Sequence, residues 1–166
     1  RRIRYIDSLI KNKKRFASKP SVLDVGCAYG PFLSVASDDG GQVFGTDVSR
    51  DAVSYVQSSL LFPASCAAFP DFDPAQEFGI RQFDALTMWY VIEHFQNLSS
   101  VLERVCALVK DGGVFAFSTP SAEGVSARMN TDDFYEKSPA DHYTLWEPSK
   151  ARLILKRFGF TVEKII

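Results

Sequence analysis

The residues with the clearest capacity for chemistry form a glycine loop between Asp24 and Gly30. A short apolar run of β-forming residues, 22–25, leads into Gly26, and Pro31 follows the loop. Glycines allow a sharp turn and a close approach of backbone to a ligand, and proline suits the first turn of a helix. The N–H groups of such a loop attract the polar parts of nucleotide-type ligands. We therefore predict a ligand-binding strand–loop–helix turn; the alternative is a turn that serves packing alone.

A second candidate is Asp47, which ends the next apolar run, 43–47, and lies 21 residues after Gly26. A carboxylate at the end of the second strand can accept hydrogen bonds from both hydroxyls of a ribose. The alternative is an acid that only stabilises the helix start at Ser49. Because any adenosine-containing cofactor carries a ribose, Asp47 does not discriminate between dinucleotides and other cofactors.

The only two histidines, His94 and His142, are candidates for acid–base chemistry near neutral pH. His142 lies among aromatic residues, Tyr135, Tyr143 and Trp146, a composition typical of a pocket wall. Each histidine also has a structural alternative: His94 bonded to backbone at a helix start, and His142 packed without a chemical role.

Strand and helix patterns alternate along the chain that positions these residues. Alternation of this kind predicts an α/β fold, with a doubly wound, mostly parallel sheet and helices on both faces. In such sheets ligands bind beyond the carboxyl ends of the strands, which is where the glycine loop and Asp47 fall. The predicted strands are 22–25, 43–47, 61–66, 83–89, 114–117 and 161–166, and the predicted helices are 32–36, 49–60, 98–109 and 148–158, the third closed by 110–113.

The remaining segments have less regular patterns. Residues 71–82 are predicted to form an irregular surface loop, and 118–147 a lid or substrate-facing segment. Residues 1–19 carry eight Lys and Arg against one acid, with apolar residues at helical spacing. We expect an N-terminal amphipathic helix there; a nucleic-acid-binding arm is the alternative.

The composition fits a single domain over 1–166. The chain has 46% hydrophobic residues and a net charge of −1, which argues against nucleic acid as its partner. No apolar run is long enough to span a bilayer, so a cytoplasmic protein without membrane contact is expected. The first residue is Arg, which suggests a piece of a longer protein. The cysteines, Cys27, Cys66 and Cys106, show no metal-binding spacing and are expected to be buried, reduced thiols.

Taken together, the motifs resemble those of class I S-adenosylmethionine-dependent methyltransferases, whose first motif is an acid followed by G-x-G-x-G. Within that class the chain is most similar to small-molecule enzymes like the ubiquinone-biosynthesis O-methyltransferases. The resemblance rests on the segments 24–30, 45–49, 83–85, 91–94, 108–113 and 158–160, together with Thr119-Pro120 and His142. The resemblance implies S-adenosylmethionine as the cofactor and methyl transfer to a small molecule, more readily at oxygen.

The resemblance also implies roles for individual residues. The loop backbone would hold the methionine part of the cofactor, through Gly26, Cys27, Ala28, Tyr29 and Gly30. Asp24 would order that loop or meet the amino group through water. Asp47 would bind the ribose, and Val48 would lie against the adenine. Ser65 stands at the place of the family's adenine-binding acid, and the backbone N–H of Cys66 would meet the adenine ring. Met88 and Trp89 would lie beside the methionine part.

Two departures from the family pattern bear on these implied roles. Some relatives bind a divalent metal through Glu-x-x-Glu-His, but Tyr90 stands at the first of these positions before Glu93 and His94, so no metal is predicted. The usual seventh, antiparallel strand is not predicted either. His94 and His142 remain the catalytic candidates. The alternative functions are a non-catalytic cofactor-binding or scaffolding module and an NAD-dependent oxidoreductase. The sequence leaves the oligomeric state open.

Overall fold

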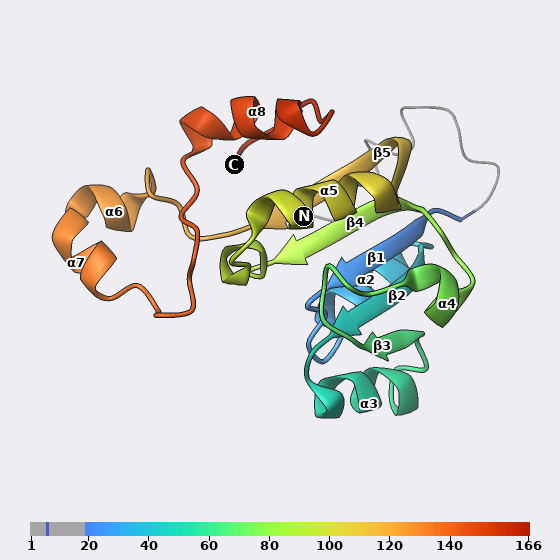
Figure 1. The fold of residues 1–166 in the computed structure, drawn as a ribbon. Coiled ribbons are helices and arrows are strands. Elements are labelled where there is room, and N and C mark those ends of the chain that lie inside the picture. The colour runs from blue at the N-terminus through green and yellow to red at the C-terminus, as the bar shows by residue number, and fades with distance from the viewer. Residues whose placement is uncertain (1–5, 7–18) are drawn as a thin grey trace.

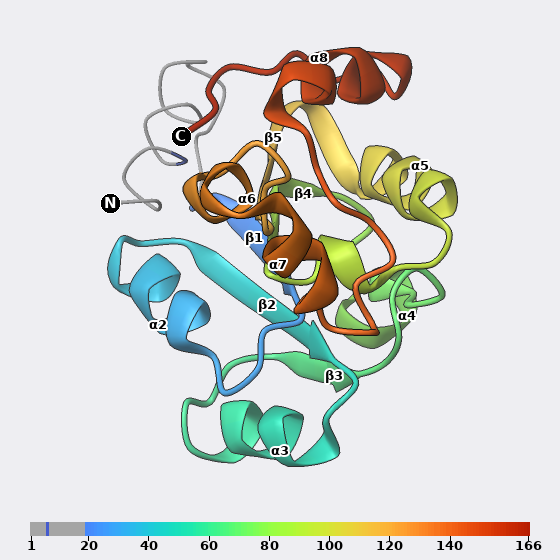
Figure 2. The same cartoon turned by 90° about the vertical axis from the view of Figure 1, so that its left-hand side faces the viewer.

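The computed structural model describes Ile6 and residues 19–166, which form one parallel sheet flanked by helices (Figures 1 and 2). The sheet order is β3-β2-β1-β4-β5, and every pairing is parallel. The topological switch point lies between β1 and β4, because the chain builds the sheet outward on both sides from there. This arrangement confirms the predicted doubly wound, Rossmann-like fold. The strands are β1 (Ser21–Val25), β2 (Gln42–Asp47), β3 (Ala64–Cys66), β4 (Phe83–Trp89) and β5 (Val109–Ser118).

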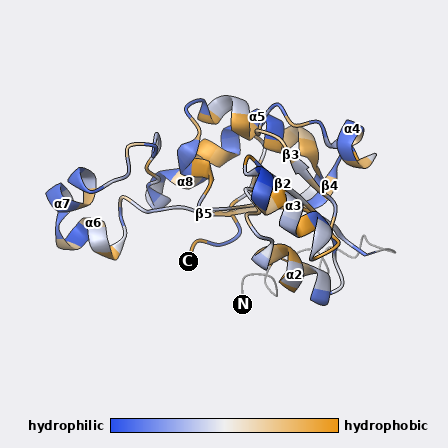
Figure 3. Ribbon diagram, turned by 90° about the horizontal axis from the view of Figure 1, so that it is seen from below, coloured by the Kyte–Doolittle hydropathy of each residue, from blue (hydrophilic) through white to orange (hydrophobic). Residues whose placement is uncertain are grey.

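Hydrophobic clusters cover both faces of the sheet. On one face, α2 and α3 bury Leu33 and Val56 against β2 and β3. On the other face, α5 and α8 bury Leu102 and Leu155 against the central strands, with α4 beside them. These helices are α2 (Pro31–Asp38), α3 (Arg50–Ser58), α4 (Pro74–Phe78), α5 (Leu98–Leu108) and α8 (Pro148–Arg157). In Figure 3 the ribbon of α5 shows hydrophobic stretches, as its contact with the sheet requires.

The segment 118–147 extends past the carboxyl ends of the strands. It contains α6 (Val125–Met129) and α7 (Thr131–Glu136), which project away from the sheet (Figure 1). A bridge between Ser121 and Trp146 brings the two legs of the segment together. The short 3-10 helix η1 (Ile92–His94) follows β4 at the same edge. The predicted substrate-facing segment therefore lies at the ligand-binding edge of the sheet, and its role as a lid remains a prediction.

Three local predictions of secondary structure were wrong. Residues 161–166 form no strand; Val162 packs on the core, and its carbonyl accepts a hydrogen bond from Arg152 at 2.8 Å. Residues 71–82 contain α4, because Asp73 caps a helix that Pro74 begins. Residues 110–113, predicted as the end of a helix, belong to β5, where they create an irregularity in the pairing with β4.

The other sequence expectations have mixed outcomes. The predicted N-terminal helix lies outside the described residues except for Ile6, which is helical and packs against Val22 and Ala85. Cys27 is buried as expected, but Cys66 and Cys106 are exposed, which corrects the expectation of three buried thiols. None of the helices in the described part of the chain is long and apolar enough to cross a bilayer.

Candidate cofactor and acceptor site

The glycine loop is a tight turn held against the end of β2. The N–H groups of Gly26 and Cys27 both donate to the carbonyl of Thr46, at 2.8 and 3.1 Å. Gly26 and Gly30 have φ values of 70° and 74°, a region that favours glycine. A Cβ on Gly26 would lie 2.4 Å from Cγ2 of Val91, so the space beside this glycine is filled by the chain just after β4.

Asp47 links the glycine loop to the start of α3. One of its carboxylate oxygens accepts from the N–H of Ala28 and the other from the N–H of Ser49, each at 2.8 Å. A carboxylate has about four lone-pair directions, so Asp47 retains capacity for two more donors. Ala28 itself has φ of 47°, the left-handed region, at a position where the family motif has glycine.

Asp24 lies inside the sheet rather than at its edge. The carboxyl group is only 2% exposed, and the hydroxyl of Thr87 on β4 donates to it at 2.6 Å. Burial raises the pKa of Asp24 to about 7; the Thr87 hydrogen bond opposes this shift, and the charge of Asp47 adds to it. The side chain of Asp24 thus links β1 to β4, and both roles that the sequence left open for it stay predictions.

The predicted adenine-side residues differ in exposure. Val48 is exposed, and the thiol of the exposed Cys66 lies 3.7 Å from the Val48 carbonyl, so these two residues share one surface. Ser65 is buried, and its hydroxyl donates to Glu77 on α4 at 3.0 Å. The hydroxyl of Ser65 is therefore already engaged away from that surface.

The predicted methionine-side residues serve mainly in packing. The side chain of Met88 is fully buried in the hydrophobic core. Trp89 packs against Phe32 of α2, with 5.1 Å between ring centroids. Tyr29 is 58% exposed and packs edge-on against Tyr55. Of these three, only Tyr29 offers a largely open side chain; Met88 can meet a ligand only through its backbone.

The two histidines meet although 48 residues separate them in the sequence. Their rings are T-shaped, with 4.8 Å between centroids. Nδ1 of His94 lies 3.1 Å from the carbonyl of Asp141 and 3.2 Å from its carboxylate. Both oxygens are acceptors, so Nδ1 carries the proton and Nε2 is left to accept one. In this tautomer Nε2 of His94 could accept a proton, a role that stays a prediction, and Asp141 is a neighbour that the sequence did not reveal.

Glu93 is a further residue of this cluster. It is 1% exposed, and its carbonyl accepts from the N–H of Tyr143 at 2.8 Å, which draws the segment around His142 toward η1. Potential ligand atoms of Glu93, His94 and His142 all lie within 4.8 Å of one another, a spacing that could hold a metal ion. The prediction of no metal is untested, but it rested on Tyr90 alone and did not foresee His142 in this cluster.

The parallel sheet, its glycine loop and the acid at the end of β2 define a domain that binds a nucleotide-type cofactor at the switch point. Comparison with known proteins identifies the family of this domain. Residues 1–165 match the family described as "Methyltransferase domain". The chain belongs to this methyltransferase family. The expected family is confirmed, and with it S-adenosylmethionine as the cofactor of the class.

Individual relatives agree with this assignment. Over 120 residues the chain is 29% identical to the ubiquinone biosynthesis O-methyltransferase of Nitrosomonas europaea, covering 71% of this chain and 49% of the relative. A similar structure is a SAM-dependent methyltransferase from Archaeoglobus fulgidus, with TM-score 0.67, 20% identity, and coverage of 96% and 69%. Another is the magnesium protoporphyrin IX methyltransferase of Synechocystis with bound SAH, with TM-score 0.70, 14% identity, and coverage of 98% and 75%. The chain spans about half the length, or less, of the curated relatives it matches.

Proposed function

We propose that this chain transfers the methyl group of S-adenosylmethionine to a hydroxyl oxygen of a small molecule. The observation that carries the proposal is that Asp47 is fixed to the glycine loop while the histidine pair follows β4 at the same edge. The O-methyltransferase names of the curated relatives support oxygen as the acceptor atom.

The cofactor side of the proposal fits the contacts of the loop. Asp47 would accept the ribose hydroxyls with its remaining lone pairs, and the loop from Gly26 to Gly30 would hold the methionine part through its backbone. Val48 and Cys66 would lie against the adenine, with Ser65 behind them, and Trp89, packed on Phe32, would lie on the methionine side. When bound, S-adenosylmethionine supplies an electrophilic methyl group on a sulfonium.

The acceptor side rests on the histidine pair. Nε2 of His94 would take the proton of the acceptor hydroxyl as its oxygen becomes the nucleophile, and Asp141 would hold the ring in the required tautomer. His142, packed edge-on against His94, would form part of the acceptor wall. Because the carboxyl ends of the strands carry both halves of the site, the acceptor can be aligned with the cofactor, which is the main task in a displacement.

The test is a calorimetric titration of S-adenosylhomocysteine into the chain, beside Asp47→Ala and an NADH control. We expect micromolar binding that Asp47→Ala weakens, and none for NADH. Methyl consumption is then measured over a panel of small phenols, alcohols, amines and carboxylic acids. Product from hydroxyl compounds supports the proposal. Cofactor binding without turnover of any acceptor would favour the non-catalytic binding module, and binding of NADH alone would favour the oxidoreductase.

A further inference from the structure

Two acid–histidine sequences face each other at the carboxyl edge of the sheet. Glu93-His94 belongs to η1, and Asp141-His142 ends a turn in which the N–H of His142 donates to the carbonyl of Pro139 at 3.0 Å. The two histidine rings are in contact, and Nδ1 of His94 lies 3.2 Å from the carboxylate of Asp141. One acid–histidine pair is thus formed between the two sequences, and Glu93 and His142 are the members that remain.

The side chains of Glu93 and His142 each bring one unpartnered atom into the interior. Oε2 of Glu93 and Nδ1 of His142 are buried and have no hydrogen-bond partner within the described part of the chain. Glu93 is only 1% exposed, and none of the ion pairs among the described residues includes it. Burying a carboxylate without a donor is costly, and so is burying a ring nitrogen without a partner. Since solvent does not reach these two atoms, the chain itself has to supply their partners.

The two groups are close enough to serve each other. A carboxylate oxygen of Glu93 and a ring nitrogen of His142 lie within 4.8 Å. The last torsion of a glutamate side chain is broad, so rotation of the carboxyl group can bring an oxygen nearer to hydrogen-bond distance. His94 is also close, but its Nδ1 already lies beside Asp141. The histidine left for Glu93 is therefore His142.

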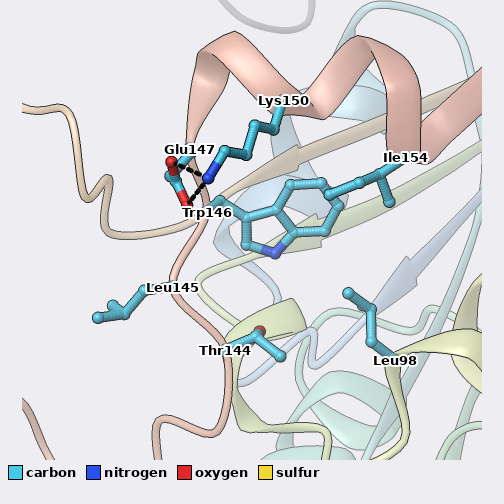
Figure 4. Close-up of a pocket in the computed structure, with 7 residues that line it drawn as sticks. All are labelled: Leu98, Thr144, Leu145, Trp146, Glu147, Lys150 and Ile154. Carbon is cyan, nitrogen blue, oxygen red and sulfur yellow. Dashed lines mark hydrogen bonds and ion pairs between the residues drawn. The ribbon is translucent and has the colours of Figure 1, made fainter.

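The backbone of Glu93 already holds the segment that carries His142. The carbonyl of Glu93 accepts from the N–H of Tyr143 at 2.8 Å and from the N–H of Thr144 at 3.3 Å. Beyond Thr144 the chain continues through Trp146 to the start of α8 (Figure 4). Trp146 is 5% exposed and belongs to the hydrophobic core. The position of His142 relative to Glu93 is therefore secured by two hydrogen bonds and by a buried side chain further along the chain.

We propose that Glu93 is a positioning residue that acts through His142. Its carboxylate accepts a hydrogen bond from the Nδ1–H of His142, which fixes the tautomer of the ring. Nε2 of His142 is then free to accept a hydrogen bond from the methyl acceptor. This inference rests on the proposed function, in which His142 forms part of the acceptor wall. Asp141 bears the same relationship to His94, so each of the two histidines has its own acid.

Long-range proton–nitrogen NMR spectra of the histidine rings test the proposal directly. The chain has only two histidines, so His94→Asn and His142→Asn assign all ring signals. Protonated and unprotonated ring nitrogens give separate signals. The spectra are recorded in EDTA, so that no metal ion occupies a ring nitrogen, and at about pH 8, where a histidine with an ordinary pKa is neutral. In the parent chain Nδ1 of His142 should carry a proton, and an unprotonated Nδ1 would overturn the proposal without any variant.

Variants of Glu93 separate positioning from packing. Glu93→Met keeps the length of the side chain but removes its oxygens, so the Nδ1 signal of His142 should move toward the unprotonated position while that of His94 stays. Glu93→Gln keeps a carbonyl acceptor and should restore the parent signal. Asp84→Asn is the matched control, because it also removes a buried carboxylate, at the opposite end of β4, and should leave both rings unchanged.

Thermal unfolding of each variant shows whether it is folded. A His142 signal that stays in place in folded Glu93→Met, or that Asp84→Asn moves equally, would contradict the pairing of Glu93 with His142.

Kinetics show whether the pair acts in turnover. Glu93→Met should raise the KM of the acceptor about two- to tenfold, the range for one hydrogen bond, and leave S-adenosylhomocysteine binding unchanged. Adding Glu93→Met to His142→Asn should raise the KM no further, because Glu93 acts only through that ring. Additive effects, or an unchanged KM in folded Glu93→Met, would overturn the proposal. The NMR readout needs neither cofactor nor turnover, so failure of the proposed methyl transfer is distinguishable from failure of the pair.

Discussion

The carboxylate of Asp47 accepts a hydrogen bond from the backbone N–H of Ala28 at 2.8 Å, which ties the end of β2 to the middle of the glycine loop. Ala28 has φ of 47°, a conformation that costs an alanine about 1–2 kcal/mol compared with glycine. The hydrogen bond offsets part of that cost. Asp47 therefore has two tasks, to shape the loop and to leave lone pairs for a ribose.

Replacing Asp47 by Ala should weaken S-adenosylhomocysteine binding about 10- to 100-fold, because hydrogen bonds to a charged group contribute about 1.5–3 kcal/mol. Calorimetry gives the dissociation constants. Asp51→Asn, an exposed acid in the first turn of α3, is the matched control and should bind as the parent does. Unchanged affinity in Asp47→Ala would remove Asp47 from the cofactor site.

The order of strands and helices could be predicted because each central strand is a short, mainly apolar run between glycine or capping signals. β1 and β4 are buried along almost their whole length, as strands covered by helices on both faces must be. Residues 161–166 have a strand-like composition, but a strand forms only where an edge pairs with it. Here Val162 bonds to Arg152 on α8 instead. That choice depends on tertiary packing, which local pattern does not report.

In the site, too, neighbours within one strand–helix unit could be predicted from the sequence, whereas contacts between distant segments could not. The glycine loop and Asp47 follow from spacing within one strand–helix unit. Nothing in the sequence places His142 beside His94, because the path of residues 118–147 decides it. Thr87 gives a weak signal, because it is a polar residue inside the predicted strand 83–89; the structure places it in register with Asp24 on the neighbouring strand.

Gly26→Ala should destabilise the fold by at least about 2 kcal/mol, since a left-handed alanine and an overpacked contact each cost about 1–2 kcal/mol or more. The added Cβ would lie 2.4 Å from Val91. Gly79→Ala is the matched control, because Gly79 has φ of 71° but no atom within 4 Å of the added Cβ. Urea unfolding measures both. Val91→Ala should recover the steric part of the loss in Gly26→Ala; equal losses at Gly26 and Gly79 would rule out the contact.

Asp24 should make stability fall as the pH rises from about 4 to about 7. Its pKa in the folded chain is about 7, above the ordinary value of 3.8, so over this range the unfolded chain has released the proton and the folded chain keeps it. The stabilisation is complete below the lower value and is lost as the pH passes the upper one. At 1.36 kcal/mol per pKa unit the change amounts to about 4 kcal/mol at most. Urea unfolding of the parent and Asp24→Asn across this range measures it; parallel curves would contradict the shift.

The three thiols should react unequally. Burial, and then the charges of Asp24 and Asp47, raise the pKa of the Cys27 thiol to about 12, whereas Cys66 and Cys106 are exposed. Iodoacetamide at pH 8 should therefore add two groups to the native chain and three in urea, as counted by intact mass. Peptide mapping identifies the unmodified residue. A native chain that takes up three groups would show that the glycine loop opens.

The histidine pair should affect turnover without affecting cofactor binding. Because Nδ1 of His94 is fixed by Asp141, His94→Asn should lower kcat about 10²–10⁴-fold, the range for loss of a general base, and Asp141→Asn should lower it less. His142→Asn should raise the KM of the acceptor. All three variants should bind S-adenosylhomocysteine like the parent chain, and Asp132→Asn on α7 is the control with unchanged turnover.

Dialysis against EDTA separates this assignment from metal ligation: a base needs no metal, so turnover should persist. Activity that is lost on dialysis and restored by a divalent ion would instead make Glu93, His94 and His142 metal ligands.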